Sequence, residues 1–185
     1  MWVFARHLPA GYTILAPRAP LAAPQGGYSW REIAEGTWGF PSVDDLKPVV
    51  EALFDFVDRW SVSVSLAAAN FDVIGFSQGA ALAYALALLH PDRVRVLAAL
   101  SGFLPSGSEA YLAGRPLEGK PVYVVHGTLD ERIPIDRARS AVRLLQASGA
   151  AVTYCEAEIG HKVSKDCLNG LQDYFASKYN QSIFP

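Results

Sequence analysis

The chain has 185 residues, of which 51% are hydrophobic and 18% are charged. This balance excludes a disordered chain and predicts one globular domain, residues 1–185, with a sizeable core. The formal net charge is −2 and Lys and Arg form no cluster, so neither a nucleic acid nor an anionic membrane surface is expected as a partner.

Signals for a compartment or a membrane are weak. The longest apolar run, Gly79–Leu89, has 11 residues, whereas a membrane-spanning helix needs about 20. Arg6 and several prolines interrupt Met1–Pro24, which argues against a signal peptide. Cys155 and Cys167 lie at no metal-ligand spacing. We expect two free thiols, with a disulfide as the lesser alternative, in a cytoplasmic protein.

Short apolar runs alternate with helical segments along the chain. Near-continuous runs of Val, Ile, Leu and Tyr are typical of strands buried on both faces of a sheet. In chain order the expected strands are Tyr12–Ala16, Phe71–Gly75, Val94–Ser101, Pro121–His126 and Ala151–Glu156. The expected helices are Val43–Trp60, Gln78–Leu89, Ile135–Ser148 and Ser164–Tyr179. This alternation predicts the α/β class, with a mostly parallel sheet covered by helices on both faces.

Two of the expected helices have distinctive sequences. An apolar stripe with helical spacing runs along Val43–Trp60, and Ser42 with Asp45 resembles a capping box at its start. The helix Gln78–Leu89 is apolar on all sides, so we expect it to be buried.

The segment Phe71–Gly79 carries the pattern G-x-S-x-G between a predicted strand and a predicted helix. Such a turn forces Ser77 into strained backbone angles, so that its hydroxyl projects above the sheet. Gly75 and Gly79 are expected to remove side chains that would collide where strand and helix close on each other. The backbone N–H of Gln78 can face a developing oxyanion, where the helix dipole adds positive charge. The pattern predicts Ser77 as a nucleophile.

A nucleophilic serine needs a base, and the base needs an acid that orients it. In hydrolases with G-x-S-x-G on a strand–helix turn, the order along the chain is Ser, acid, His. Asp130, with Glu131 as its neighbouring rival, ends the loop after a predicted strand, and His161 lies in the loop before the last helix. Both loops follow the C-terminal ends of strands, where a parallel sheet exposes its catalytic loops.

The other three of the four histidines are weaker candidates for the base. His7 and His90 lie outside any such loop, and His90 is expected to end a helix. His126 ends a strand and is expected to structure the loop that follows it.

Several motifs, in this order, resemble the phospholipase/carboxylesterase family, which includes the acyl-protein thioesterases. They are Gly75-Phe-Ser-Gln-Gly-Ala80, Leu100-Ser-Gly-Phe-Leu-Pro105, His126-Gly-Thr-Leu-Asp130 and Gly160-His161, and the stretch from Leu8 to Trp30 also resembles the family. The resemblance covers nearly the whole chain. It implies an α/β-hydrolase fold and hydrolysis of carboxylic esters or thioesters, with no metal and no organic cofactor.

The resemblance also implies roles for individual residues. Ser77, Asp130 and His161 match the catalytic triad, and Gln78 supplies one oxyanion donor through its N–H. Leu104 matches a position that lines the family's acyl pocket, with plain loop packing as the alternative.

The start of the chain departs from the family pattern. Family members begin with a strand whose His-Gly loop supplies the second oxyanion N–H, but Met1–Pro9 matches the end of the helix that follows this strand. The absent strand would lie between those matching Tyr12–Ala16 and Phe71–Gly75, which would leave a gap inside the sheet. Three explanations are open: a fragment or misplaced start, direct pairing of the two strands, or a strand from another chain. Losing the second donor costs roughly two to three orders of magnitude in rate.

We therefore expect a serine hydrolase that cleaves a small-molecule ester or thioester through an acyl-enzyme. Tyr28, Trp30, Trp38 and Phe40 lie close together in sequence, either as a wall of the acyl site, with Trp30 as the substrate-binding residue, or as the loop's own packing. The alternatives are a catalytically impaired hydrolase-fold binding protein and a hydrolase of an amide or another acyl bond. A homodimer is left open.

Overall fold

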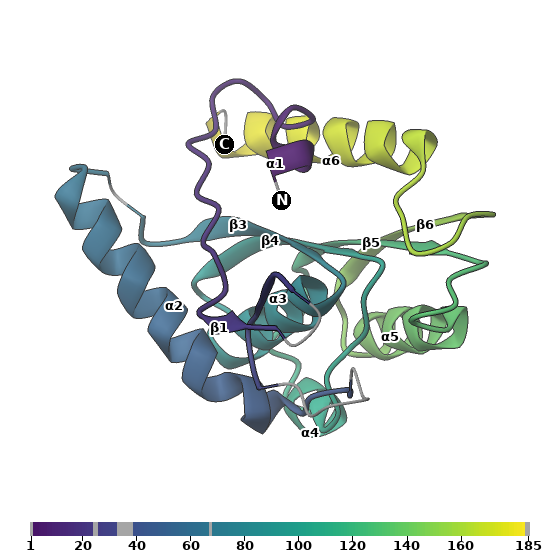
Figure 1. Cartoon of the computed structure of the whole chain (residues 1–185). Coiled ribbons are helices and arrows are strands. Elements are labelled where there is room, and N and C mark those ends of the chain that lie inside the picture. Colours follow the sequence, from purple (N-terminus) through teal and green to yellow (C-terminus); the bar gives the residue numbers. More distant parts are fainter. Residues whose placement is uncertain (1, 24–25, 33–38, 67, 184–185) are drawn as a thin grey trace.

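The computed structural model describes residues 2–23, 26–32, 39–66 and 68–183 (Figure 1). Within this part of the chain the main sheet has four parallel strands that neighbour one another in sequence order. They are β3 (Phe71–Phe76), β4 (Val94–Leu100), β5 (Pro121–Gly127) and β6 (Ala151–Ala157). Each corresponds to a predicted strand, with ends that differ by one residue.

Helices cover both faces of this sheet (Figure 1). On one face lie α2 (Val43–Ser63), α3 (Gln78–Leu89) and α5 (Ile135–Ala147), and on the other lie α1 (Trp2–Ala5) and α6 (Lys165–Ile183). The short helix α4 (Ser108–Leu112) follows β4, and β1 (Leu21–Ala22) pairs with β2 (Tyr28–Ser29) in a separate antiparallel ribbon. The α/β prediction with helices on both faces is confirmed. No helix in the described ranges is long and apolar enough to cross a membrane.

Strand side chains alternate between two apolar clusters, one on each face of the sheet. In β4, Leu97 packs under α3, while Ala98 and Leu100 face the side of α6. The predicted burial of α3 is confirmed, since every residue from Ala80 to Leu88 is buried. These two clusters explain why the strands are apolar in continuous runs rather than in alternation.

The first long helix begins as its sequence predicts. The Ser42 side chain accepts a hydrogen bond from Asp45 N–H at 3.1 Å, and the Asp45 carboxylate accepts one from Ser42 N–H at 2.8 Å. This capping box satisfies backbone donors that the first turn leaves without partners.

The predicted strand Tyr12–Ala16 is wrong, and so is its direct pairing with β3, because this segment is irregular. β3 pairs with β4, and none of the described strands pairs with its other edge. A strand persists only where a neighbouring backbone accepts and donates its hydrogen bonds. Tyr12 is held by its side chain, whose hydroxyl donates to Asp72 Oδ2 at 2.6 Å, and Arg95 donates to the same oxygen at 2.7 Å.

The prediction of two free thiols is also wrong. Cys155 on β6 and Cys167 on α6 form a disulfide, with Cα atoms 5.8 Å apart. Their separation of 12 residues in sequence does not reveal this pairing. The chain reverses direction between β6 and α6, and this reversal brings the two side chains together.

Reduction of the disulfide is expected to lower the free energy of unfolding by about 2–4 kcal/mol, because the cross-link restricts the unfolded chain. Urea denaturation with and without a reductant measures this difference. A Cys155→Ala/Cys167→Ala variant serves as the control and should not respond to the reductant. Alkylation of both cysteines in unfolded but unreduced protein would contradict the disulfide.

Candidate active site

Ser77 lies on the tight turn between β3 and α3. Its backbone angles are φ 56° and ψ −120°, which a non-glycine residue rarely adopts. Two backbone hydrogen bonds hold the turn: Ser77 N–H donates to Leu100 O at 2.9 Å, and Ala80 N–H donates to Ser77 O at 3.0 Å. The side chain is thereby presented at the carboxyl end of the sheet.

The glycines around this turn have unequal functions. A Cβ on Gly75 would lie 2.0 Å from Gly79 O, so the crossing of strand and helix requires glycine at position 75. The expectation for Gly79 is wrong, because a Cβ there would meet nothing within 4 Å. Gly102, which the sequence did not single out, approaches the start of α3 as closely as Gly75 does. A Cβ on Gly102 would lie 2.2 Å from Ala80 Cβ and 3.0 Å from Ser77 O.

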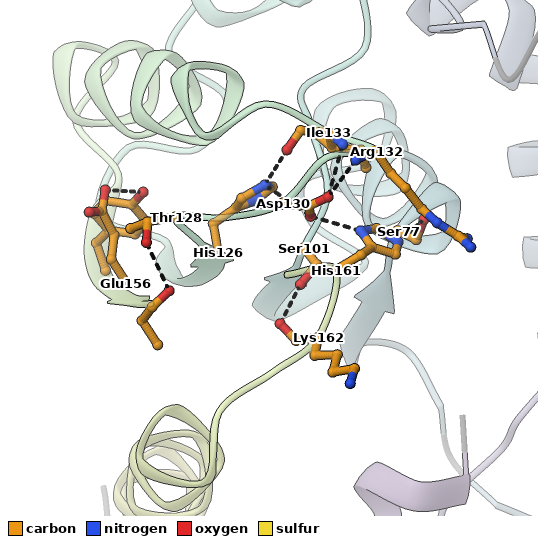
Figure 2. Close-up of polar contacts among 12 residues, drawn as sticks. Ser77, Ser101, His126, Thr128, Asp130, Arg132, Ile133, Glu156, His161 and Lys162 are labelled. Atoms are coloured by element: carbon orange, nitrogen blue, oxygen red, sulfur yellow. Dashed lines mark hydrogen bonds and ion pairs between the residues drawn. The ribbon is translucent and has the colours of Figure 1, made fainter. Parts of the chain in front are cut away.

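His161 lies between Ser77 and Asp130 (Figure 2). Its Nε2 is 2.9 Å from Ser77 Oγ, and its Nδ1 is 2.7 Å from Asp130 Oδ2. These residues are 84 and 31 positions apart in sequence, and the fold alone brings them together. The arrangement fits an imidazole whose Nδ1–H donates to the carboxylate and whose Nε2 accepts the serine hydroxyl.

The Asp130 carboxylate is almost fully buried and accepts hydrogen bonds on both oxygens. Oδ1 accepts the backbone N–H groups of Arg132 at 2.9 Å and Ile133 at 3.0 Å. Burial raises the pKa of Asp130, but the Ile133 N–H, His161 and the Arg132 N–H together outweigh it and lower the pKa below its usual value. Asp130 is therefore a carboxylate at neutral pH. The rival residue, Glu131, is exposed.

His126 holds the turn whose backbone N–H groups donate to Asp130, which confirms its predicted structural role. The ring is 1% exposed, and its Nε2 donates to Ile133 O at 2.8 Å. The same nitrogen lies 3.4 Å from Asp130 Oδ2. This contact closes the turn, so that the Ile133 N–H is aimed at the carboxylate. His90 lies elsewhere, at the end of α3, against Glu51.

The loops that carry Asp130 and His161 are bonded directly to each other. Leu129 N–H donates to Ile159 O at 3.0 Å. A Cβ on Gly127, at the end of β5, would lie 2.3 Å from both Ile159 O and Gly160 O. Glycine at position 127 therefore permits the approach that places the imidazole beside the carboxylate.

Ser101, which the sequence reasoning missed, also holds the His161 loop. It is fully buried, has a φ of 46°, and its hydroxyl donates to Lys162 O at 2.9 Å (Figure 2). Phe76 packs against the imidazole from another side, with ring centroids 5.1 Å apart. In the sequence Ser101 is the last residue of a predicted strand and part of the family-like motif Leu100–Pro105, and neither feature indicates this contact.

The predicted aromatic group is divided in the structure. Trp30 is partly buried and packs against the same apolar cluster as Leu104. Phe40 packs edge-on against Phe103 with centroids 4.7 Å apart, whereas Tyr28 is 55% exposed. Trp38 lies outside the described residues. The backbone of Trp30 is bonded to the turn between β3 and α3, because its N–H donates to Gln78 Oε1 at 3.0 Å.

No group of three or more His, Cys, Asp and Glu side chains in the described ranges could hold a metal ion. The polar groups that converge here are a hydroxyl, an imidazole and a carboxylate in series. A hydroxyl paired with a base, and a base oriented by an acid, can perform nucleophilic acyl transfer.

The parallel sheet, its helical layers and the serine on the strand–helix turn define the chain as an α/β-hydrolase. The phospholipase/carboxylesterase family matches residues 12–178, and the chain belongs to this family. The resemblance found in the sequence is thereby confirmed.

Relatives and solved structures agree with this assignment. A probable inactive carboxylesterase of Oryza sativa subsp. japonica is 31% identical over 172 residues, which are 90% of this chain and 66% of that protein. Carboxylesterase SOBER1 of Arabidopsis thaliana is 27% identical over 178 residues, 90% of this chain and 76% of that protein. The Bacillus cereus carboxylesterase structure has a TM-score of 0.78 at 19% identity, with 95% of this chain and 80% of that chain covered, and shows the same fold. This chain spans about two thirds of the length of the rice relatives.

Gly127→Ala is expected to lower the free energy of unfolding by about 1–3 kcal/mol, because the new methyl group forces the loops that carry Asp130 and His161 apart. Gly79→Ala is the matched control: its methyl group enters open space, so stability should stay the same or rise by up to about 1 kcal/mol. Thermal and urea unfolding of the two variants measure the difference. Equal stability of both would contradict the close approach at Gly127.

The lowered pKa of Asp130 makes its contribution to stability depend on pH. A carboxyl whose pKa is lower in the folded state stabilises the fold above its unfolded pKa of about 3.9 and loses this effect as the pH falls through the folded pKa. Below about pH 4 the wild type should therefore lose stability relative to Asp130→Asn, because asparagine does not titrate. Urea unfolding at several pH values tests this, and a difference that stays constant down to acid pH would contradict it.

Proposed function

We propose that this chain is a serine hydrolase that cleaves carboxylic esters or thioesters through an acyl-enzyme. The observation that carries the proposal is the hydrogen-bonded series Ser77–His161–Asp130. His161 Nε2 is 2.9 Å from Ser77 Oγ and His161 Nδ1 is 2.7 Å from Asp130 Oδ2, and Ser77 lies on a strained strand–helix turn. Membership of the phospholipase/carboxylesterase family and the carboxylesterase names of its relatives support the same reaction class.

In the proposed reaction Ser77 Oγ attacks the carbonyl carbon of the substrate while His161 Nε2 takes the hydroxyl proton. Asp130 stabilises the imidazolium that forms. Collapse of the tetrahedral intermediate breaks the bond to the leaving oxygen or sulfur, which receives the proton from His161. Water then attacks the acyl-enzyme, with His161 again as the base, and releases the acid and free Ser77.

The carbonyl oxygen becomes negatively charged in both tetrahedral intermediates. The backbone N–H of Gln78, the first residue of α3, is the donor we assign to it, and the N-terminal end of the helix dipole adds to the stabilisation. This assignment follows from the turn, because the residue after the nucleophile presents its N–H on the same side as Ser77 Oγ.

The acyl group is proposed to lie against Trp30 and Leu104. At Gly102 the segment after β4 passes directly beside the turn that carries Ser77, and Leu104 follows two residues later. Both side chains pack against one cluster that also contains Phe103. The proposed acyl wall therefore consists of residues from two segments that are far apart in sequence.

A catalytically impaired binding protein is the second candidate. It is favoured by the rice relative named as probably inactive and by the edge of β3 that no described strand covers. The intact series of hydroxyl, imidazole and carboxylate favours the enzyme, because a binding function does not require them in contact. Amide or other acyl bonds are further substrates that this triad could attack.

The proposed partner is a small-molecule ester or thioester. A cytoplasmic location and the absence of a nucleic acid partner stay predictions, and a homodimer stays open. The cytoplasmic prediction was drawn in part from free thiols, and the Cys155–Cys167 disulfide removes that support, because disulfides persist mainly in oxidising compartments.

Ser77→Ala is expected to abolish the burst with a chromogenic short-chain ester and to lower kcat by about six orders of magnitude, because no acyl-enzyme can form. Stopped-flow absorbance measures the burst, and a fluorophosphonate probe should label wild type but not this variant. Ser63→Ala, an exposed serine on α2, is the matched control and should behave as wild type. Absence of labelling in folded wild type would favour the binding protein, and unchanged turnover in Ser77→Ala would sink the nucleophile assignment.

A further inference from the structure

The Gln78 side chain leaves the nucleophile turn and bonds to a distant segment. Its Oε1 accepts the Trp30 N–H at 3.0 Å, and its Nε2 donates to Ser29 Oγ at 3.0 Å. The partners are 48 and 49 residues away in sequence. Because a backbone N–H can only donate, the Trp30 contact determines which end of the amide is the oxygen. The two contacts therefore use both ends of the amide in one orientation.

Ser29 completes a closed network. Its hydroxyl donates to Arg31 O at 2.6 Å, and its oxygen then accepts from both Gln78 Nε2 and Arg31 N–H at 3.0 and 3.3 Å. Ser29 is only 2% exposed, although its neighbour Tyr28 is 55% exposed. A buried hydroxyl with every proton and lone pair engaged holds its segment in one position.

We propose that the Gln78 side chain is a positioning residue that fixes Trp30 over the nucleophile turn and thereby sets the acyl-chain selectivity of the site. This inference rests on the proposed function. We refer to the contacts of Gln78 with Ser29 and Trp30 as the amide clamp. Glutamine suits this position because it combines an acceptor for Trp30 with a donor for Ser29. Glutamate lacks the donor and methionine lacks both.

The amide clamp links two parts of the proposed site through one residue. The backbone N–H of Gln78 is assigned to the oxyanion, and its side chain holds the backbone of Trp30. The Trp30 side chain packs against the same apolar cluster as Leu104. The clamp thereby holds Trp30 at a fixed distance from Ser77. Without the clamp, Trp30 keeps its apolar packing but loses the bonds that determine its distance from the nucleophile.

The first test is hydrogen exchange at the Trp30 amide, which does not depend on activity. In wild type this amide is bonded to Gln78 Oε1 and should exchange slowly. Gln78→Met, which has a similar length but no amide, should speed its exchange, and Ser29→Ala should do so less. The control is Gln146→Met, the same change at an exposed position in α5, which should leave the exchange unchanged. Unchanged exchange in Gln78→Met would overturn the clamp.

The second test is selectivity across p-nitrophenyl esters from acetate to octanoate. In Gln78→Met the ratio of kcat/KM for octanoate to that for acetate should fall about tenfold, mainly through KM for the longer ester. Ser29→Ala should shift the ratio in the same direction, which covers the case in which Gln78→Met does not fold. Gln146→Met should retain the wild-type ratio.

A double-mutant cycle with Trp30→Ala shows whether Gln78 acts through Trp30. If it does, the two changes in selectivity should be strongly non-additive, because Gln78→Met has nothing to displace once the indole is gone. Additive effects, or an unchanged ratio, would overturn the selectivity inference. Wild type that neither hydrolyses these esters nor takes up a fluorophosphonate would overturn the proposed function and the selectivity inference, while the exchange test would still decide whether the clamp exists.

Discussion

The close approach of β3 and α3 at Gly75 is the constraint on which the site depends. A side chain there would overlap the backbone of Gly79, so the strand and helix could not meet at this distance. Their meeting places Ser77 at positive φ, with its hydroxyl at the carboxyl end of the sheet. The same turn puts the Gln78 N–H at the first position of α3 and sends the Gln78 side chain toward Ser29 and Trp30.

The rest of the site is assembled around this turn by the parallel sheet. Ser77 follows β3, Asp130 follows β5 and His161 follows β6, and the carboxyl ends of these strands lie at one edge. Strand order alone would leave the loops free to move. Direct contacts remove that freedom: the backbone approach at Gly127 joins the Asp130 and His161 loops, and the buried Ser101 hydroxyl bonds to the chain beside His161. These contacts give the imidazole two short hydrogen bonds at once.

Elements whose signal is local were predictable from the sequence. The apolar runs of β3 to β6 and the four long helices were placed to within a few residues, because burial of each element leaves its own periodicity in the chain. The strand predicted at Tyr12–Ala16 failed, since a strand also requires a neighbour, and none of the described strands lies there. The Cys155–Cys167 disulfide and the open space around Gly79 were missed for a related reason, because both depend on what another segment places nearby.

The residues proposed to carry the chemistry could be identified from local patterns in the amino-acid sequence. Motif order singled out Ser77, Asp130 and His161, and the strand–helix context predicted the turn, because those residue types and the punctuation by glycine are local properties. The contacts that hold these residues in place became visible only in the folded chain. The partner N–H groups of Asp130, the Ser101 contact and the amide clamp of Gln78 join residues that are distant in the chain, and hydrogen-bond partners of this kind leave no periodic trace in a sequence.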